Sequence, residues 1–248
     1  MGWIMSASRI FGIVVAVLLG AASAVAGDRS PTVVELYTSQ GCSSCPPADR
    51  YLGKLAERED IIALSFHVNY WDYIGWKDTF ALPESTARQR RHGRALNARY
   101  VYTPEMVIGG VVDVVGSQSH EVEKTLAEAR LSSLNSLSVS LTESDQASAT
   151  IRICAKAEWP EADVWLIEFD KQHTVNVRRG ENSGRQLTYY NVVRNIRKVG
   201  TWKGDMTEIP VDLSAIREGG RDGCVVIVQK AHGGPIFGAA RLQLLASN

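Results

Sequence analysis

The stretch Thr38–Asp49, TSQGCSSCPPAD, joins an apolar segment to a segment with helical spacing. The residues before it, Val33 to Tyr37, form a short apolar run that predicts a buried strand. The apolar residues after it, between positions 51 and 56, recur at the spacing of one helix face. A C-x-x-C motif between a strand and a helix is typical of a redox-active disulfide.

The placement of the two cysteines has a chemical reason. A cysteine at a helix N-terminus faces free backbone N–H groups and the positive end of the helix dipole, which favour thiolate over thiol. We therefore expect Cys42 to be the attacking nucleophile and Cys45 the resolving thiol. The motif alone leaves two alternatives open, a structural disulfide and half of a zinc site, and zinc needs two further ligands.

The first residues predict export. Arg9 precedes the apolar run 10–19, and small residues follow, ending in Ala24-Val25-Ala26. This pattern predicts a signal peptide over residues 1–26, with an uncleaved anchor as the alternative, and a periplasmic or secreted protein. The 27 basic and 27 acidic residues balance, which gives no support to nucleic-acid binding. No second apolar run is long enough to span a bilayer, so we expect no membrane association after cleavage.

The next segments continue a mixed α/β pattern. The apolar run 60–68 predicts a second strand and, with the helix before it, a βαβ unit. An aromatic-rich segment and a helix over residues 83–98 follow. Thr103-Pro104 opens a short apolar strand that returns after Gly109-Gly110 as a hairpin. Ser117 begins a closing helix.

This order is similar to that of thioredoxin-like proteins. Pro104 aligns with the cis-proline that lies beside the C-x-x-C in that superfamily, and residues 104–116 resemble the corresponding hairpin of glutaredoxins. The 37 residues 67–103 leave room for a helical insert, as in periplasmic disulfide-forming oxidoreductases. Gly41 stands where thioredoxin has tryptophan, and Ser43-Ser44 replaces Gly-Pro, so the resemblance does not imply a redox direction.

A more specific resemblance is to the bacterial family known as domain of unknown function 1223. It rests on residues 35–49, 67–78, 89–90, 102–104 and 179–182. It implies the fold and a secreted location, and it implies no reaction.

The thioredoxin resemblance also suggests site residues beside the cysteines. Glu35 stands where a buried acid could move a proton from the resolving thiol, and its pKa would then be raised by desolvation. The alternative is a glutamate that faces solvent or pairs with an arginine. Thr103 and Pro104 are expected to present a backbone edge to substrate. Trp71 and Trp76 either line a groove for an apolar peptide or belong to the core.

The residues after position 134 have a different pattern. Alternating apolar residues predict many short strands, typical of an antiparallel sandwich or small barrel. We therefore predict a thioredoxin-like domain with a helical insert over residues 27–134 and a β-rich domain over 135–248. Arg178 to Arg185 reads as a polar hairpin tip. Cys154 and Cys224 either form a structural disulfide, our first interpretation, or are free thiols.

The sequence supports three functional hypotheses. The leading one is a thiol–disulfide oxidoreductase acting on protein or small-thiol substrates, with a redox partner that the sequence does not identify. The second is a non-enzymatic binding or scaffold protein with a structural Cys42–Cys45 disulfide. The third is a metal carrier that uses the two thiolates and a histidine. The first two require no cofactor and no metal, and oligomeric state is left open.

Overall fold

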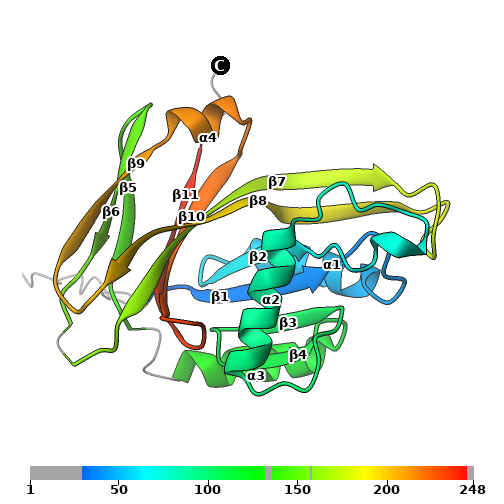
Figure 1. The fold of residues 1–248 in the computed structure, drawn as a ribbon, viewed down its shortest axis with the longest axis horizontal. Helices are drawn as coiled ribbons and strands as arrows, with labels where there is room; N and C mark the ends of the chain where they lie inside the picture. The colour runs from blue at the N-terminus through cyan, green and yellow to red at the C-terminus, as the bar shows by residue number, and fades with distance from the viewer. Residues whose placement is uncertain (1–29, 132–135, 157, 245–248) are drawn as a thin grey trace, which may run out of the picture.

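The computed structural model describes residues 30–131, 136–156 and 158–244, so the predicted signal peptide lies outside the described residues. The described chain forms two sheets, with strand orders β11-β10-β7-β8-β2-β1-β3-β4 and β5-β6-β9 (Figure 1). Its elements, in chain order, are β1 (Thr32–Thr38), α1 (Pro46–Ala56), β2 (Ile61–His67), η1 (Asp72–Ile74), α2 (Pro83–Ala95), β3 (Glu105–Ile108), β4 (Val112–Val115), α3 (Ser119–Leu131), β5 (Val139–Asp145), β6 (Ser148–Ile153), β7 (Ala162–Asn176), β8 (Gln186–Trp202), β9 (Thr207–Asp212), α4 (Ser214–Glu218), β10 (Gly223–Lys230) and β11 (Ile236–Gln243). Within these described residues, no helix has the length and apolar character needed to cross a membrane.

The first half of the chain has the predicted strand–helix–strand order. β1 and β2 are parallel, β3 pairs antiparallel with β1, and β4 pairs with β3. All residues of β1 and β2 are buried, because α1 and α3 cover one face, while α2 and apolar side chains of β7, β8 and β10 cover the other. Leu36 packs with Leu52 of α1 and Val122 of α3 on one face. α2 covers the other face (Figure 1), where Arg88 contacts Glu35.

The strands after residue 135 do not form a separate barrel. β7, β8, β10 and β11 extend the first sheet, which β8 joins by lying parallel to β2 at Ser65 and Val192. β5, β6 and β9 form an antiparallel second sheet, and apolar side chains such as Ile151 and Val226 fill the space between the two sheets. The architecture is therefore mixed α/β with an eight-stranded and a three-stranded sheet. The domain division at 134/135 stays a prediction.

The long hairpin of β7 and β8 brings the C-terminal half of the chain to the C-x-x-C loop. Its two strands have 15 and 17 residues, and its turn lies next to η1 and the start of α1 (Figure 1). We call residues 178–185 the hairpin tip. Gly180 and Gly184 have φ of +76° and +80° there, a region that glycine adopts without strain.

The structure contradicts our first interpretation of Cys154 and Cys224 as a disulfide: both are free cysteines. Alternation along β6 explains the difference. Ile153 points into the core between the sheets, so the next residue, Cys154, faces solvent. Cys224 lies inside that core, with Val226 beside it on the same face of β10. The two thiols therefore point to different environments.

Candidate functional site

Cys42 and Cys45 form a disulfide directly before α1, with Cα atoms 5.4 Å apart. Cys45 is the N-cap of α1, and Cys42 lies in the turn that precedes the helix, where its N–H donates to the carbonyl of Ser39. Both cysteines are fully buried. The pair therefore occupies the predicted place, but its sulfur atoms are covered.

Residues of the hairpin tip bond the backbone of the C-x-x-C loop. The side-chain amide of Asn182 donates to the carbonyl oxygens of Gln40 and Cys42, over 3.0 Å and 2.9 Å. Asn182 is itself fully buried. Glu181 accepts a hydrogen bond from the Ser43 N–H at 3.3 Å. The C-terminal half of the chain thus holds the backbone of the C-x-x-C loop, a role that the sequence analysis missed.

Trp71 and Trp76, which we predicted either to line a peptide groove or to belong to the core, are half-buried and lie in the loops around the disulfide. The Trp71 indole N–H donates to Thr103 Oγ1 at 2.8 Å, and that of Trp76 donates to Gln40 Oε1 at 2.8 Å. A Cβ atom on Gly41 would lie 3.2 Å from Trp71 Cβ, so a larger residue there would require Trp71 to shift by a few tenths of an ångström. Trp71 therefore connects the C-x-x-C loop to the Thr103–Pro104 loop.

The Thr103–Pro104 peptide bond is cis, as predicted. Pro104 is buried, and its carbonyl accepts the N–H of Gly116 at the end of the β3–β4 hairpin. The roles in substrate binding that we assigned to Thr103, Pro104, Trp71 and Trp76 remain predictions.

A layer of buried polar side chains lies between α1 and the ends of β1, β2 and β8. We call it the polar layer; its members are Thr38, Asp49, His67, Asp78 and Tyr189. Thr38 Oγ1 donates to Asp49 Oδ1 at 2.7 Å. His67 Nδ1 lies 2.7 Å from Asp78 Oδ2, and Asp78 Oδ2 also accepts the N–H of Gln40. The layer is therefore bonded to the C-x-x-C loop through Gln40.

Three buried atoms of the polar layer have no hydrogen-bond partner within the described part of the chain. They are Asp49 Oδ2, His67 Nε2 and the Tyr189 hydroxyl. The His67 and Tyr189 rings meet edge to face, with centroids 4.6 Å apart. Unpaired buried polar atoms cost about 1–3 kcal/mol each, and they often mark functional sites.

Asp49 is a buried carboxyl group one helical turn after Cys45, and its pKa is raised. Burial raises its pKa to about 7, although the Thr38 hydrogen bond opposes the shift. Asp49 follows Cys45 by four residues on α1, and helical residues at that spacing share a face. A carboxyl group beside Cys45 that titrates near neutral pH can exchange a proton with its thiol.

Glu35 does not have the raised pKa that we predicted. Burial alone would raise it, but the charges and hydrogen bonds of Arg88 and His92 outweigh that effect and hold the pKa of Glu35 well below its usual range. Arg88 donates to both carboxylate oxygens at 2.7 Å, and the Tyr37 hydroxyl donates at 2.7 Å. Glu35 thus pairs with an arginine on the α2 face of the sheet, opposite Asp49.

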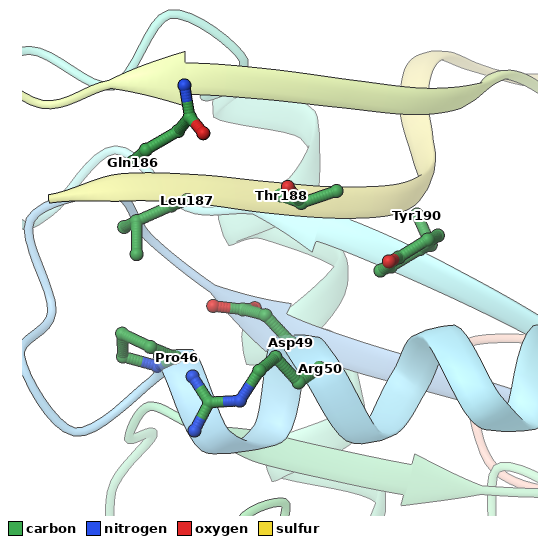
Figure 2. A pocket seen from close by; sticks show the side chains of 7 residues that line it. All are labelled: Pro46, Asp49, Arg50, Gln186, Leu187, Thr188 and Tyr190. Carbon is green, nitrogen blue, oxygen red and sulfur yellow. The ribbon is translucent and has the colours of Figure 1, made fainter.

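An open groove runs beside the polar layer between α1 and β8 (Figure 2). A hollow of about 200 Å³ has Asp49, Arg50 and Tyr190 among its lining residues. A second hollow, of about 560 Å³, shares Arg50 and extends to Ser43 and Arg185. We call the two hollows together the α1–β8 groove.

The described residues contain no group of three or more His, Cys, Asp or Glu side chains placed to hold a metal ion. The site defined by this fold is a C-x-x-C disulfide at the start of a helix in a mixed α/β protein.

Residues 33–229 match the family model described as "Protein of unknown function (DUF1223)", so the chain belongs to this family. It is also similar to a protein from Agrobacterium tumefaciens whose structure was solved by X-ray crystallography. The two are 34% identical, the match covers 90% of this chain and 98% of that one, and the TM-score is 0.77. No curated protein matches this chain.

Proposed function

We propose that this protein is an exported thiol–disulfide oxidoreductase that acts through Cys42 and Cys45 on protein or small-thiol substrates. The observation that carries the proposal is the position of Asp49, one helical turn after the C-x-x-C disulfide on α1. Asp49 is buried on the same face of α1 as Cys45, and its pKa is raised to about 7. Export rests on the signal-like sequence of residues 1–26.

We also propose that residues 27–134 have a thioredoxin-like fold, which would support the same function. The strand order β2-β1-β3-β4, with β3 antiparallel to β1, suits that fold. α1 and α3 lie on one face and α2 on the other, and the cis peptide bond before Pro104 occurs at the aligned position.

The chemistry follows from these positions. A substrate thiolate attacks Cys42 Sγ, the Cys42–Cys45 bond breaks, and Cys45 leaves as a thiolate that takes a proton from Asp49. A second substrate thiolate then attacks the substrate sulfur of the mixed disulfide and releases Cys42. The substrate is oxidised by two electrons and the cysteine pair is reduced. The reverse sequence reduces a substrate disulfide.

Two measurements test this function in the mature protein. We expect the disulfide to equilibrate with glutathione buffers, and we expect Cys45→Ser to accumulate mixed disulfides that Cys42→Ser does not form. A reduction potential below about −300 mV, typical of structural disulfides, together with no adducts on Cys45→Ser, would reject the proposal.

That outcome would favour the second candidate, a binding or scaffold protein with a structural disulfide. The complete burial of both cysteines favours this candidate. Under the first proposal the same burial requires a local opening of the C-x-x-C loop before a substrate reaches the sulfur atoms.

A further inference from the structure

We propose that the α1–β8 groove binds a small thiol that carries a carboxylate and an N–H donor, and that this thiol is the redox partner of the Cys42–Cys45 pair. The inference rests on the oxidoreductase function proposed above and names the substrate class of that site.

The position of the groove connects it to the disulfide. Ser43 and Pro46, which line its outer part, are the residues directly after Cys42 and Cys45. Its inner part reaches Asp49 and Tyr190. A ligand in the groove therefore lies along the first turns of α1, next to the backbone of the reacting cysteines.

The charges around the outer part favour an anion. Arg50 is exposed and belongs to both hollows, and its charge also acts on Asp49 of the inner hollow, where burial raises the pKa and the Arg50 charge opposes that rise. Arg185 donates to Asn182 Oδ1, a neutral oxygen, so its charge is not neutralised by that bond. Glu181 is the acidic residue at this edge, and it already accepts the Ser43 N–H. Two guanidinium groups at one opening suit a carboxylate ligand.

The floor of the groove supplies the second point of recognition. Asp49 is 3% exposed, and its Oδ2 has no hydrogen-bond partner in the described chain. Its side chain extends from α1 toward β8, into the space that Leu187 and Thr188 border (Figure 2). An N–H donor of the ligand would satisfy this oxygen. Cysteine derivatives with an amide and a carboxylate combine both features with a thiol.

The proposed exchange needs no further reactant. One ligand thiolate attacks Cys42 Sγ, and Cys45 Sγ leaves and is protonated. A second ligand thiolate attacks the ligand sulfur of the mixed disulfide, which releases the ligand disulfide and the Cys42 thiolate. Two ligand thiols are oxidised, and one protein disulfide is reduced.

A matched pair of thiols tests the carboxylate preference. N-acetylcysteine and N-acetylcysteamine differ only in the carboxylate, and both carry the amide N–H. For each thiol we would measure the second-order rate constant for reducing the oxidised protein, at pH 8 and 0.15 M ionic strength. Dividing it by the rate constant of the same thiol with a small model disulfide corrects for the thiol's intrinsic reactivity. We expect a normalised ratio of about 10 in favour of N-acetylcysteine, the size of one favourable charge contact.

Substitutions of the two arginines then test whether they cause the preference for the thiol with a carboxylate. Arg50→Gln should reduce the ratio several-fold, and Arg185→Gln should do the same. Lys54→Gln is the matched control, because it removes the same charge from an exposed position on the same helix but not from the groove. 3-Mercaptopropionate lacks the N–H, so we expect it to react more slowly than N-acetylcysteine.

The results separate this inference from the function on which it rests. A ratio near one, or an equal fall in Arg50→Gln and Lys54→Gln, would overturn the groove proposal and leave the oxidoreductase intact. Failure of every thiol to reduce the disulfide would reject the oxidoreductase function itself.

Discussion

The contact between Asn182 and the C-x-x-C loop predicts how fast the disulfide reacts. The Asn182 amide is the donor of two buried hydrogen bonds, to the carbonyls of Gln40 and Cys42. Because both cysteines are buried, we expect reduction to occur from an open conformation in which the two Asn182 bonds to the C-x-x-C loop are broken. Asn182→Ala removes both bonds and should make this open conformation more populated.

The expected increase in the rate of reduction can be estimated from the loss of the two hydrogen bonds. Each hydrogen bond contributes about 1 kcal/mol net, so the loss of two shifts the equilibrium toward the open conformation by about 2 kcal/mol. Since 1.4 kcal/mol is a factor of ten, the open population should rise by about 30-fold. If opening is fast relative to exchange, the rate of reduction by dithiothreitol rises by the same factor.

The assay is acid quenching of the reduction, followed by alkylation and mass spectrometry of the peptide with Cys42 and Cys45. Asn176→Ala is the control, because the Asn176 side chain belongs to the same hairpin and accepts a hydrogen bond from the exposed Gln186 side chain, away from the C-x-x-C loop. Glu181→Ala, which removes a single exposed contact, should accelerate reduction less than Asn182→Ala. Reduction of folded Asn182→Ala at the rate of the control would refute the proposed role of the tip.

Other contacts lead to three further predictions. In the range between pH 3.8 and about 7 the native state binds the Asp49 proton more tightly than the unfolded state, so this group's contribution to stability is lost as pH rises through 7. Between pH 5 and the native-state pKa of about 7 this loss amounts to about 2.7 kcal/mol, at 1.36 kcal/mol per pH unit. Urea unfolding should therefore show the free energy of unfolding of Asp49→Asn, relative to that of the wild type, rising by about 2.7 kcal/mol from pH 5 to pH 8; a relative free energy that does not change with pH would contradict the raised pKa. Arg88→Leu should lower the free energy of unfolding by about 3–5 kcal/mol, because it leaves the Glu35 carboxylate buried without its arginine and with only Tyr37 and His92 as partners. The double variant Glu35→Leu/Arg88→Leu should recover much of the loss, and an equal loss in the double variant would contradict this account. Ellman's reagent should label the exposed Cys154 in the folded protein and Cys224 only after unfolding, because Cys224 is buried and burial raises its pKa to about 12. Protection of both thiols in the folded protein would instead support the disulfide interpretation.

Local patterns made the first half of the fold predictable. The apolar run before Cys42, the helical spacing after Cys45 and the Thr103–Pro104 hairpin each depend on residues close in sequence, and the structure contains all three. The C-terminal strands were also recognisable from their alternation. Their partners were not, because the pairing of β8 with β2 joins residues as far apart as Ser65 and Val192. Periodicity states which face of a strand is buried and not which strand lies beside it.

The same limit applies to the site. Asn182 bonds a residue 140 positions away in the chain, and the hairpin-tip sequence alone resembles an ordinary polar turn. The free thiols of Cys154 and Cys224 show a different difficulty. Both lie in or next to strands, as expected, but pairing depends on which face each side chain occupies, and the two sheets had to be placed before that could be known.

We predicted a raised pKa for Glu35, and the structure gives it to Asp49 instead. The side-chain alternation of β1 and the helical repeat of α1 explain this difference. Along β1, Leu36 and Thr38 point toward α1, so Glu35 must point to the other face, where α2 supplies Arg88. On α1, the residue four positions after Cys45 lies beside it, and this residue is Asp49. Alternation in the strand and the helical repeat therefore place the carboxylate of the ion pair and the carboxyl group that titrates near neutral pH on opposite faces of one sheet. Under the proposed function, Asp49→Asn perturbs proton exchange and Asn182→Ala perturbs the opening of the C-x-x-C loop, so the two steps can be tested separately.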